Sequence, residues 1–323
     1  MRIFVTGGAG FIGLAVVRRL VARGDRVVAL VRDPERATAL RDLGVELRVG
    51  DLARVPAIVD AMRGNDSAIH LAGSYRIGIP ARERPAMLDA NVGATLRVLD
   101  AVSTADLERL VYISTCNTFG DTHGRIVDEK YRRDLSDGFL SYYDETKYLA
   151  HRAVEERIAA GAPITIAMPG VTYGPRDHSS IGRQLKGAHD GTLGYRALGS
   201  TGISAVHVDD VAAGIVAIHD RGRLGEAYVL GGQNVRLEDA IEVAARLGRR
   251  GVPRLELPVS VVRFGSHAPA WLARLAGLPD NLGEVLRSAE GVTYWASSAK
   301  AAAELGYAPR DVASGLRATF DGD

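Results

Sequence analysis

A tyrosine and a lysine four residues apart form the pair in this sequence that is best suited to chemistry. Tyr143 and Lys147 lie in the segment 141–160, which reads as a helix, so their side chains share one helix face. A tyrosine hydroxyl titrates near about pH 10, and a neighbouring ammonium group lowers that pKa by favouring the phenolate. We therefore expect Tyr143 to exchange protons with Lys147 as its partner. The neighbouring Tyr142 would pair with Thr146, which carries no charge.

Two adjacent hydroxyl residues stand where an apolar run, 110–114, predicts the end of a buried strand. Ser114 and Thr115 would lie at the carboxyl edge of a parallel sheet, which is where such sheets bind ligands. A hydroxyl group at that edge can hold a substrate oxygen beside the tyrosine. Both residues qualify by their position, and both are candidates.

A glycine-rich turn near the N-terminus predicts a dinucleotide site. The run 2–6 reads as a strand, 11–23 as a helix and 26–31 as a second strand, with glycines between the first two. Glycine permits a tight turn and a close approach of backbone to a pyrophosphate, and N–H groups at the helix start bind its oxygens. The residues expected at the pyrophosphate are Gly7, Gly10, Phe11, Ile12 and Gly13.

Apolar runs alternate with amphipathic segments through the first 170 residues. The expected strands are 2–6, 26–31, 45–49, 67–71, 110–114 and 164–168, and the expected helices are 11–23, 35–43, 55–63, 85–103 and 141–160. Such alternation is typical of the α/β class, with a doubly wound parallel (Rossmann) sheet that is covered by helices on both faces.

The chain from about residue 171 onwards follows a looser pattern, rich in glycine and proline. We expect a dinucleotide-binding domain over 1–170 and a smaller α/β substrate-binding domain over 171–323, partly interleaved with the first. A helix at 211–219 would have Asp209 as its N-cap, and 229–232 reads as the end of a strand. The apolar stretch 255–277 reads as core of the second domain, because it lacks the dense basic face of a membrane-surface helix.

The composition excludes several classes of function. The net charge of +1 over 323 residues gives no electrostatic basis for binding nucleic acid or an anionic membrane. A single cysteine, Cys116, excludes an internal disulfide, and no apolar run is long enough to span a membrane. The eight histidines show no metal-ligand spacing, so no metal site is expected. Arg2 begins a strand directly, without a signal-peptide pattern, and the expected location is the cytoplasm.

The chain resembles the extended short-chain dehydrogenase/reductase family, also called the NAD-dependent epimerase/dehydratase family. The motifs that carry the resemblance are TGGAGFIG at 6–13, GDL at 50–52, HLAG at 70–73, NVGAT at 91–95, VYISTCNTFG at 111–120, YDETK at 143–147, MPGVTYGP at 168–175 and HVDDVA at 207–212. Within the family, VRDP at 31–34 and SSAKAAAELGY at 297–307 look closest to dihydroflavonol-4-reductase-like members.

The resemblance implies a role for each matching position. Thr115 takes the family's Ser/Thr place, Tyr143 is the catalytic acid and base, and Lys147 is its partner. The cofactor-binding positions that it implies, besides the glycine turn, are Asp51 and Leu52 at the adenine, Ala72, Gly73, Asn91, Tyr143 and Lys147 near the nicotinamide ribose, and Pro169.

Two departures from the family pattern bear on the substrate. Members that eliminate water from nucleotide sugars carry an Asp-Glu pair where this chain has Cys116 and Asn117. Members that hold a nucleotide diphosphate commonly carry an asparagine and an arginine where this chain has Val171 and Met168. Both changes favour a less anionic substrate.

The residues after the second strand predict which nicotinamide nucleotide is used. An NAD site usually ends this strand in an acidic residue that binds both ribose hydroxyls. Here Arg32 comes first, and Arg36 could add charge toward a 2′-phosphate. Asp33 has the spacing of an NAD-type acid, but Pro34 follows it, which favours a role as a helix cap. We expect a preference for NADP(H), with NAD(H) as the alternative.

Three functions fit these residues. The first is a reductase that transfers hydride between nicotinamide and a carbonyl or secondary alcohol, with Tyr143 as acid and base and Thr115 orienting the oxygen. The second is an epimerase of a nucleotide sugar. The third is a cofactor-sensing regulator, which the presence of Tyr143 and Lys147 disfavours.

The expected partners are a small-molecule carbonyl, alcohol or sugar and a second copy of the chain, paired through helices 85–103 and 141–160. Tyr75 and Arg76 fall in a loop that either borders the substrate or is solvated.

Overall fold

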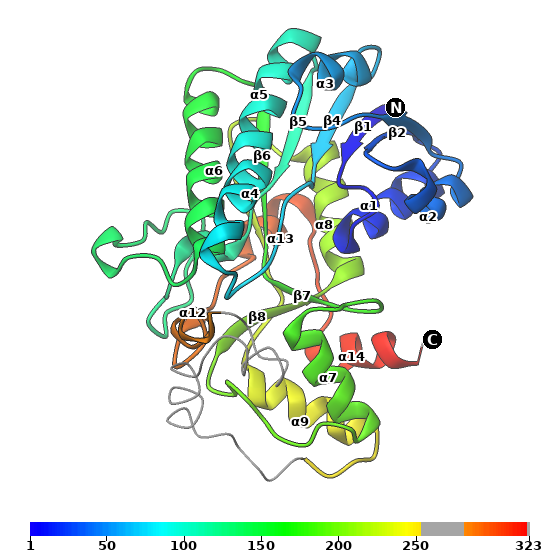
Figure 1. Cartoon of the computed structure of the whole chain (residues 1–323). Coiled ribbons are helices and arrows are strands. Elements are labelled where there is room, and N and C mark those ends of the chain that lie inside the picture. The colour runs from blue at the N-terminus through cyan, green and yellow to red at the C-terminus, as the bar shows by residue number, and fades with distance from the viewer. Residues whose placement is uncertain (253–280, 322–323) are drawn as a thin grey trace.

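The computed structural model describes residues 1–252 and 281–321, which form two β-sheets and the helices around them (Figure 1). The larger sheet has seven strands, all parallel, in the order β3-β2-β1-β4-β5-β6-β9. These strands are β1 (Arg2–Thr6), β2 (Arg26–Val31), β3 (Glu46–Val49), β4 (Ser67–His70), β5 (Arg109–Ile113), β6 (Ile164–Pro169) and β9 (Ala227–Leu230). The strand order reverses between β1 and β4, so the predicted doubly wound parallel sheet is confirmed.

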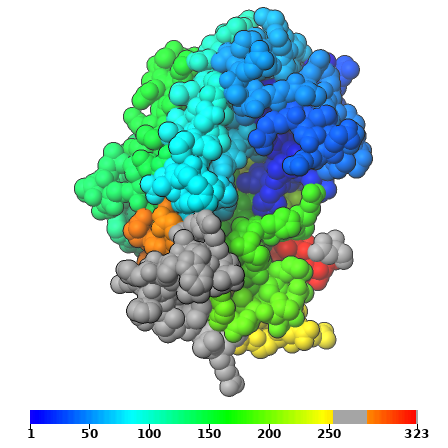
Figure 2. All heavy atoms as spheres, in the orientation of Figure 1, coloured from blue at the N-terminus to red at the C-terminus, as the bar shows by residue number. Residues whose placement is uncertain are grey.

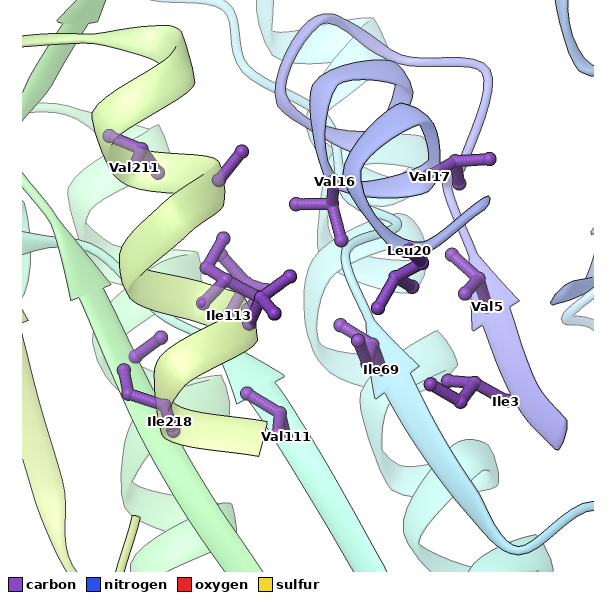
Figure 3. Packing of buried hydrophobic residues seen from close by; sticks show 14 of the residues in the cluster. Ile3, Val5, Val16, Val17, Leu20, Ile69, Val111, Ile113, Val211 and Ile218 are labelled. Atoms are coloured by element: carbon purple, nitrogen blue, oxygen red, sulfur yellow. The ribbon is translucent and has the colours of Figure 1, made fainter. Parts of the chain in front are cut away.

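Each face of this sheet has its own apolar core, because alternate side chains of a strand point to opposite faces. The helices beside the sheet are α1 (Phe11–Ala22), α2 (Thr38–Asp42), α3 (Val55–Met62), α4 (Arg84–Leu88), α5 (Ala94–Ala105), α6 (Tyr142–Ala159), α8 (Val208–Arg221) and α13 (Ala299–Leu305). Ile3 and Val5 of β1 pack with α1 and α8, as Figure 3 shows from close by. Phe4 of the same strand packs in the other core, which α3, α5 and α6 cover.

Two helices that the sequence predicts as continuous are interrupted. In place of a helix at 35–43, a 3₁₀ turn (Pro34–Arg36) precedes α2. The Asp33 carboxylate accepts a hydrogen bond from the Glu35 backbone N–H at 2.9 Å, which confirms the predicted cap. In place of a helix at 85–103, a π-helical turn (Asp89–Gly93) separates α4 from α5. Such turns place an extra residue in the helix and often occur at functional sites.

A second, smaller sheet lies below the first, built by later parts of the chain (Figure 1). Its strands are β7 (Val171–Tyr173), β8 (Gly202–His207), β10 (Gln233–Arg236) and β11 (Thr293–Tyr294). The helices near it are α7 (Ser180–Asp190), α9 (Leu237–Leu247), α12 (Leu282–Arg287) and α14 (Val312–Phe320). Figure 2 shows these later residues in green, yellow, orange and red beneath the blue and cyan atoms of the first hundred residues.

The chain after residue 171 also contributes to the larger sheet, because β9 pairs with β6. The division at residue 170 remains a prediction. The apolar stretch 255–277, which we predict to be core of the second domain, lies outside the described residues. Among the described residues, the second sheet has an apolar core of its own.

The start of α8 differs from its prediction. The helix begins at Val208, so Asp209 lies in its first turn and is not the N-cap. His207 caps the helix instead, because its Nδ1 accepts a hydrogen bond from the Asp209 backbone N–H at 3.2 Å.

Candidate active site

The turn between β1 and α1 has the shape that close approach to a phosphate requires. Gly7 has a φ of +73°, and a Cβ atom there would lie 2.6 Å from the backbone nitrogen of Ala72. A Cβ atom on Gly13 would overlap the carbonyl oxygen of Gly7. α1 begins directly after Gly10, and N–H groups in the first turn of a helix have no acceptor within it. Because no side chain fits in this turn, a pyrophosphate group can approach its backbone and bind at the N-terminus of α1.

The loop after β4 lies beside this turn. Ala72 donates its N–H toward the Thr6 hydroxyl at 3.4 Å, and Gly73 follows it. The buried Asn91, in the π-helical turn, accepts from the Ser74 N–H at 2.7 Å and donates to the Ser74 carbonyl at 3.0 Å. Its amide also donates to the Thr146 hydroxyl at 2.9 Å. Asn91 therefore ties the loop that carries the expected ribose-binding residues to α6.

The residues expected to carry out catalysis come together at the carboxyl end of β5. Tyr143 and Lys147 occupy the first two turns of α6, and Thr115 follows β5. The Lys147 ammonium donates to the Ile113 carbonyl at 2.9 Å and to the Tyr112 hydroxyl at 3.4 Å. The Thr115 side chain lies near enough to Tyr143 to lower the pKa of its phenol. All three residues are buried.

The two hydroxyl candidates face different neighbours. The Ser114 hydroxyl is 2.8 Å from Nδ1 of His151 on α6, and the other ring nitrogen of His151 lies 3.6 Å from the Glu155 carboxylate. Thr115 instead contacts Tyr143 and the Asn117 amide. The geometry therefore favours Thr115 as the residue that can hold a substrate oxygen beside the phenol.

Burial controls the protonation of the Tyr143 and Lys147 side chains. Burial raises the pKa of Tyr143 above its ordinary value, and Thr115 partly opposes that rise. The expectation that Lys147 lowers this pKa is wrong, because the Lys147 ammonium group donates to the Ile113 carbonyl and the Tyr112 hydroxyl instead. Burial also lowers the pKa of Lys147 to about 8.

A second tyrosine borders the Tyr143 phenol. The rings of Tyr75 and Tyr143 meet edge to face with centroids 4.8 Å apart, and Tyr75 is 53% exposed. Tyr143 also packs in a small apolar cluster, which contains Ile77, Ile79, Met87 and Tyr142. Arg76 is paired with Glu83 on the solvent side of the loop. The side chain of Tyr75, unlike that of Arg76, is therefore placed to contact a ligand that reaches Tyr143.

The residues expected at the adenosine end of the cofactor lie at the ends of β2 and β3. Arg32 and Asp33 are both exposed, and one Asp33 oxygen accepts the Glu35 N–H while the other lies 3.3 Å from Nε of Arg36. Asp51 is exposed and accepts the Ala53 N–H at 3.0 Å, and Leu52 follows it. Pro169, which is buried, ends β6.

The positions that depart from the family pattern hold no acid, and two of them are buried. The Cys116 thiol is buried and donates to the Met168 carbonyl at 3.3 Å, and burial raises its pKa. Met168 is buried in the core beneath α5 and α6. Val171 lies partly buried in β7.

Sequence reasoning did not identify three residues that structure this site. Tyr112 and His70 pack together beneath Lys147, and the motifs HLAG and VYIST contain them without showing their contact. Glu284 of α12 contacts the start of α6 from 142 residues away in sequence, and no local pattern signals it.

A cavity of about 1060 Å³ lies away from these residues, between α6, β9 and α13. His151 and Glu155 line it, whereas Thr115, Tyr143 and Lys147 do not. Its acidic groups are largely paired with basic neighbours, such as Glu226 with Lys300. The candidate active site, at the glycine turn and the side chains of Thr115, Tyr143 and Lys147, is therefore separate from this cavity.

Among residues 1–252 and 281–321, no three His, Cys, Asp or Glu side chains lie together as metal ligands. In the same part of the chain, no helix is both long and apolar enough to cross a membrane.

The sequence matches known proteins over most of its length. Residues 3–231 match the model of the NAD dependent epimerase/dehydratase family. A protein of Synechocystis sp., provisionally named a dihydroflavonol 4-reductase, is 30% identical over 94% of this chain and 89% of its own length. The 2-alkyl-3-oxoalkanoate reductase of Stenotrophomonas maltophilia is 30% identical over 98% of both chains.

Solved structures share the fold. The crystal structure of gox2253 has a TM-score of 0.84 at 32% identity and covers 99% of this chain and 96% of its own. UDP-glucuronic acid 4-epimerase from Bacillus cereus, in complex with UDP-glucuronic acid and NAD, has a TM-score of 0.79 at 20% identity, covering 99% and 98%. At that identity the likeness concerns the fold alone.

Proposed function

Because this chain belongs to the NAD-dependent epimerase/dehydratase family, we propose that it reduces the carbonyl group of a substrate that carries no diphosphate. It is an enzyme of the extended short-chain dehydrogenase/reductase type. The observation that carries the proposal is the grouping of Thr115, Tyr143 and Lys147 at the carboxyl end of β5, on the same sheet edge as the glycine turn. When bound, a reduced nicotinamide supplies the hydride that the carbonyl carbon accepts.

The roles of the three side chains follow from their contacts. Burial keeps the Tyr143 phenol protonated, so it can donate its proton to the carbonyl oxygen as negative charge develops there. The Thr115 hydroxyl, which reaches Tyr143, orients the same oxygen. Lys147 is mostly protonated below its pKa of about 8, so its ammonium group can donate hydrogen bonds to ribose hydroxyls.

Side chains near Tyr143 support a substrate without a diphosphate. Two arginines close to this tyrosine already have acidic partners: Arg76 pairs with Glu83, and Arg84 lies 3.7 Å from Glu284. The place of the family's arginine holds the buried Met168. Apolar residues beside Tyr143 suit a ketone with an apolar body, and the reductase named above acts, by its name, on alkylated oxoalkanoates.

We further propose NADPH as the preferred reductant. Arg32 is exposed at the end of β2, where its guanidinium group can bind a 2′-phosphate through paired hydrogen bonds. Asp33, the competing NAD-type acid, is already engaged by the Glu35 N–H and by Arg36. These contacts favour a role of Asp33 as the helix cap over a role in binding the ribose.

The alternative function is epimerisation of a nucleotide sugar, which the same three side chains could support by transient oxidation. A panel of apolar ketones, oxoalkanoates and nucleotide sugars, each with NADPH and with NADH, separates the two. Loss of reduced cofactor together with alcohol formation supports the reductase. Conversion of a nucleotide sugar without net loss of cofactor would instead establish the epimerase.

A homodimer through α5 and α6 is also proposed. Leu96 of α5 and Leu149 of α6 are large apolar side chains exposed to solvent in the single chain. Analytical ultracentrifugation of the wild type and of the L96E/L149E variant tests this pairing. The proposal expects a dimer that the two charges dissociate, and a monomeric wild type contradicts it.

A further inference from the structure

We propose that Glu284, on α12, is a positioning residue. It fixes Tyr143 relative to the loop after β4 that carries Tyr75 (the Tyr75 loop). Only the turnover measurements below rest on the proposed function. The inference starts from burial: Glu284 is a carboxylate with 1% exposure, and buried acids persist where donors surround them.

One carboxylate oxygen joins two parts of the active site. Oε1 of Glu284 accepts the backbone N–H of Tyr142 at 3.0 Å and that of Gly78 at 3.3 Å. Tyr142 is the first residue of α6 and directly precedes Tyr143, and its N–H has no acceptor within the helix. Gly78 lies three residues after Tyr75. A single atom therefore fixes the start of the catalytic helix relative to the loop that carries the second tyrosine.

The other oxygen holds the carboxylate in place. Oε2 of Glu284 accepts from the Asn281 amide at 3.1 Å and lies 3.7 Å from the Arg84 guanidinium. Asn281 also donates its backbone N–H to the Gly78 carbonyl at 3.0 Å, so Gly78 is bound on both its N–H and its C=O. Arg84 in turn lies over the Tyr142 ring, 5.0 Å from its centroid.

The contacts converge on the backbone beside Tyr143 and not on the phenol itself. Loss of the carboxylate would leave two buried N–H groups without an acceptor and the Arg84 charge without its partner. The start of α6 and the Tyr75 loop would then be free to shift against each other. A displacement of about 1 Å at a reacting group can cost roughly a hundredfold in rate.

The variants separate positioning from general stability. E284A removes both acceptor oxygens. E284Q keeps an acceptor for Tyr142 and Gly78, but turns an amide donor toward the Asn281 amide and Arg84. The double variant E284Q/N281D restores an acceptor for that introduced amide and returns a carboxylate to the cluster. E108Q, at an exposed glutamate beyond α5, is the matched control for loss of one charge.

For the reductase reaction, kcat with the carbonyl substrate should fall about a hundredfold in E284A and about tenfold in E284Q. The Kd for NADPH should stay within about twofold, because the glycine turn is untouched. E284Q/N281D should recover most of the lost kcat, and E108Q should match the wild type. A variant that melts at lower temperature yet turns over normally when folded would overturn the proposal.

A measurement without turnover keeps the two proposals distinguishable. The ¹³C tyrosine signals of the labelled protein are recorded, with those of Tyr143 and Tyr75 assigned by Y143F and Y75F. Both signals should shift in E284Q and return in E284Q/N281D. Unchanged signals in E284Q contradict positioning even if the protein proves inactive on every carbonyl, and this result also decides the matter if E284A fails to fold.

Discussion

The ring of Tyr75 meets the ring of Tyr143 edge to face, with the two centroids 4.8 Å apart. The Tyr143 phenol is buried, whereas the Tyr75 ring is half exposed on the loop after β4. The exposed ring of Tyr75 is therefore placed to contact a substrate whose carbonyl reaches Tyr143.

Replacement of Tyr75 by alanine should weaken substrate binding more than catalysis. An aromatic contact is worth about 0.5–1.5 kcal/mol beyond its buried area, so the KM for the carbonyl substrate should rise roughly two- to tenfold. Y75F keeps the ring and should stay near the wild type. Steady-state kinetics check both variants, and an unchanged KM in Y75A would show that the loop does not border the substrate.

The preference for NADPH depends on Arg32. A charge-assisted hydrogen bond is worth about 1.5–3 kcal/mol, so R32A should weaken NADPH binding about ten- to a hundredfold and leave NADH nearly unchanged. Calorimetric titration of both nucleotides measures this, with D33A as the counterpart. Tighter binding of NADH by the wild type, or a loss of NADH affinity in D33A alone, would instead assign the site to the Asp33 carboxylate.

The chain should not dehydrate nucleotide sugars to 4-keto-6-deoxy products. Elimination needs an acid and a base, and the positions where dehydratases carry them hold Cys116 and Asn117. The buried Cys116 thiol, whose pKa burial raises, donates to a backbone carbonyl and cannot replace a carboxylate. NMR of incubations with dTDP-glucose and UDP-glucose checks this, and the appearance of the keto sugar is the contrary result.

Stability should depend on pH through Lys147. Burial lowers its pKa from 10.5 to about 8, so between these values the unfolded state binds more protons than the folded state. The contribution of Lys147 to the free energy of unfolding therefore rises with pH across that window.

The variant K147M lacks this contribution. Its stability relative to the wild type should fall by about 1–2 kcal/mol between roughly pH 8 and pH 9.5. Urea unfolding of the cofactor-free proteins over that range measures the difference. A difference that is constant with pH would mean that Lys147 keeps its ordinary pKa in the fold.

Much of the fold could be predicted because its signals are local. The apolar runs at 2–6 and 26–31 match β1 and β2 residue for residue, and the Asp33 cap follows from the proline beside it. The π-helical turn at 89–93 could not be predicted, because Asn91 reaches Ser74 and Thr146, which are distant in sequence. The start of α8 was misplaced because a histidine, a less usual cap, replaces the expected aspartate.

The candidate site could likewise be predicted only where its signals are local in the sequence. The spacing of Tyr143 and Lys147 places both on one helix face, so their proximity to β5 could be anticipated. Their pKa shifts could not, because these depend on burial by chain segments that the local pattern does not reveal. Glu284 shows this most clearly, since its role arises only where α12 meets α6.

The variants Y143F and Y75F remove the same atom, a phenolic oxygen, from adjacent rings. Y143F should bind NADPH like the wild type but lose at least about a hundredfold in turnover of a carbonyl substrate, because its general acid is gone. Y75F should retain turnover. Stopped-flow fluorescence of NADPH follows binding and oxidation in one measurement. Turnover by Y143F close to that of the wild type would show that this phenol does not protonate the substrate.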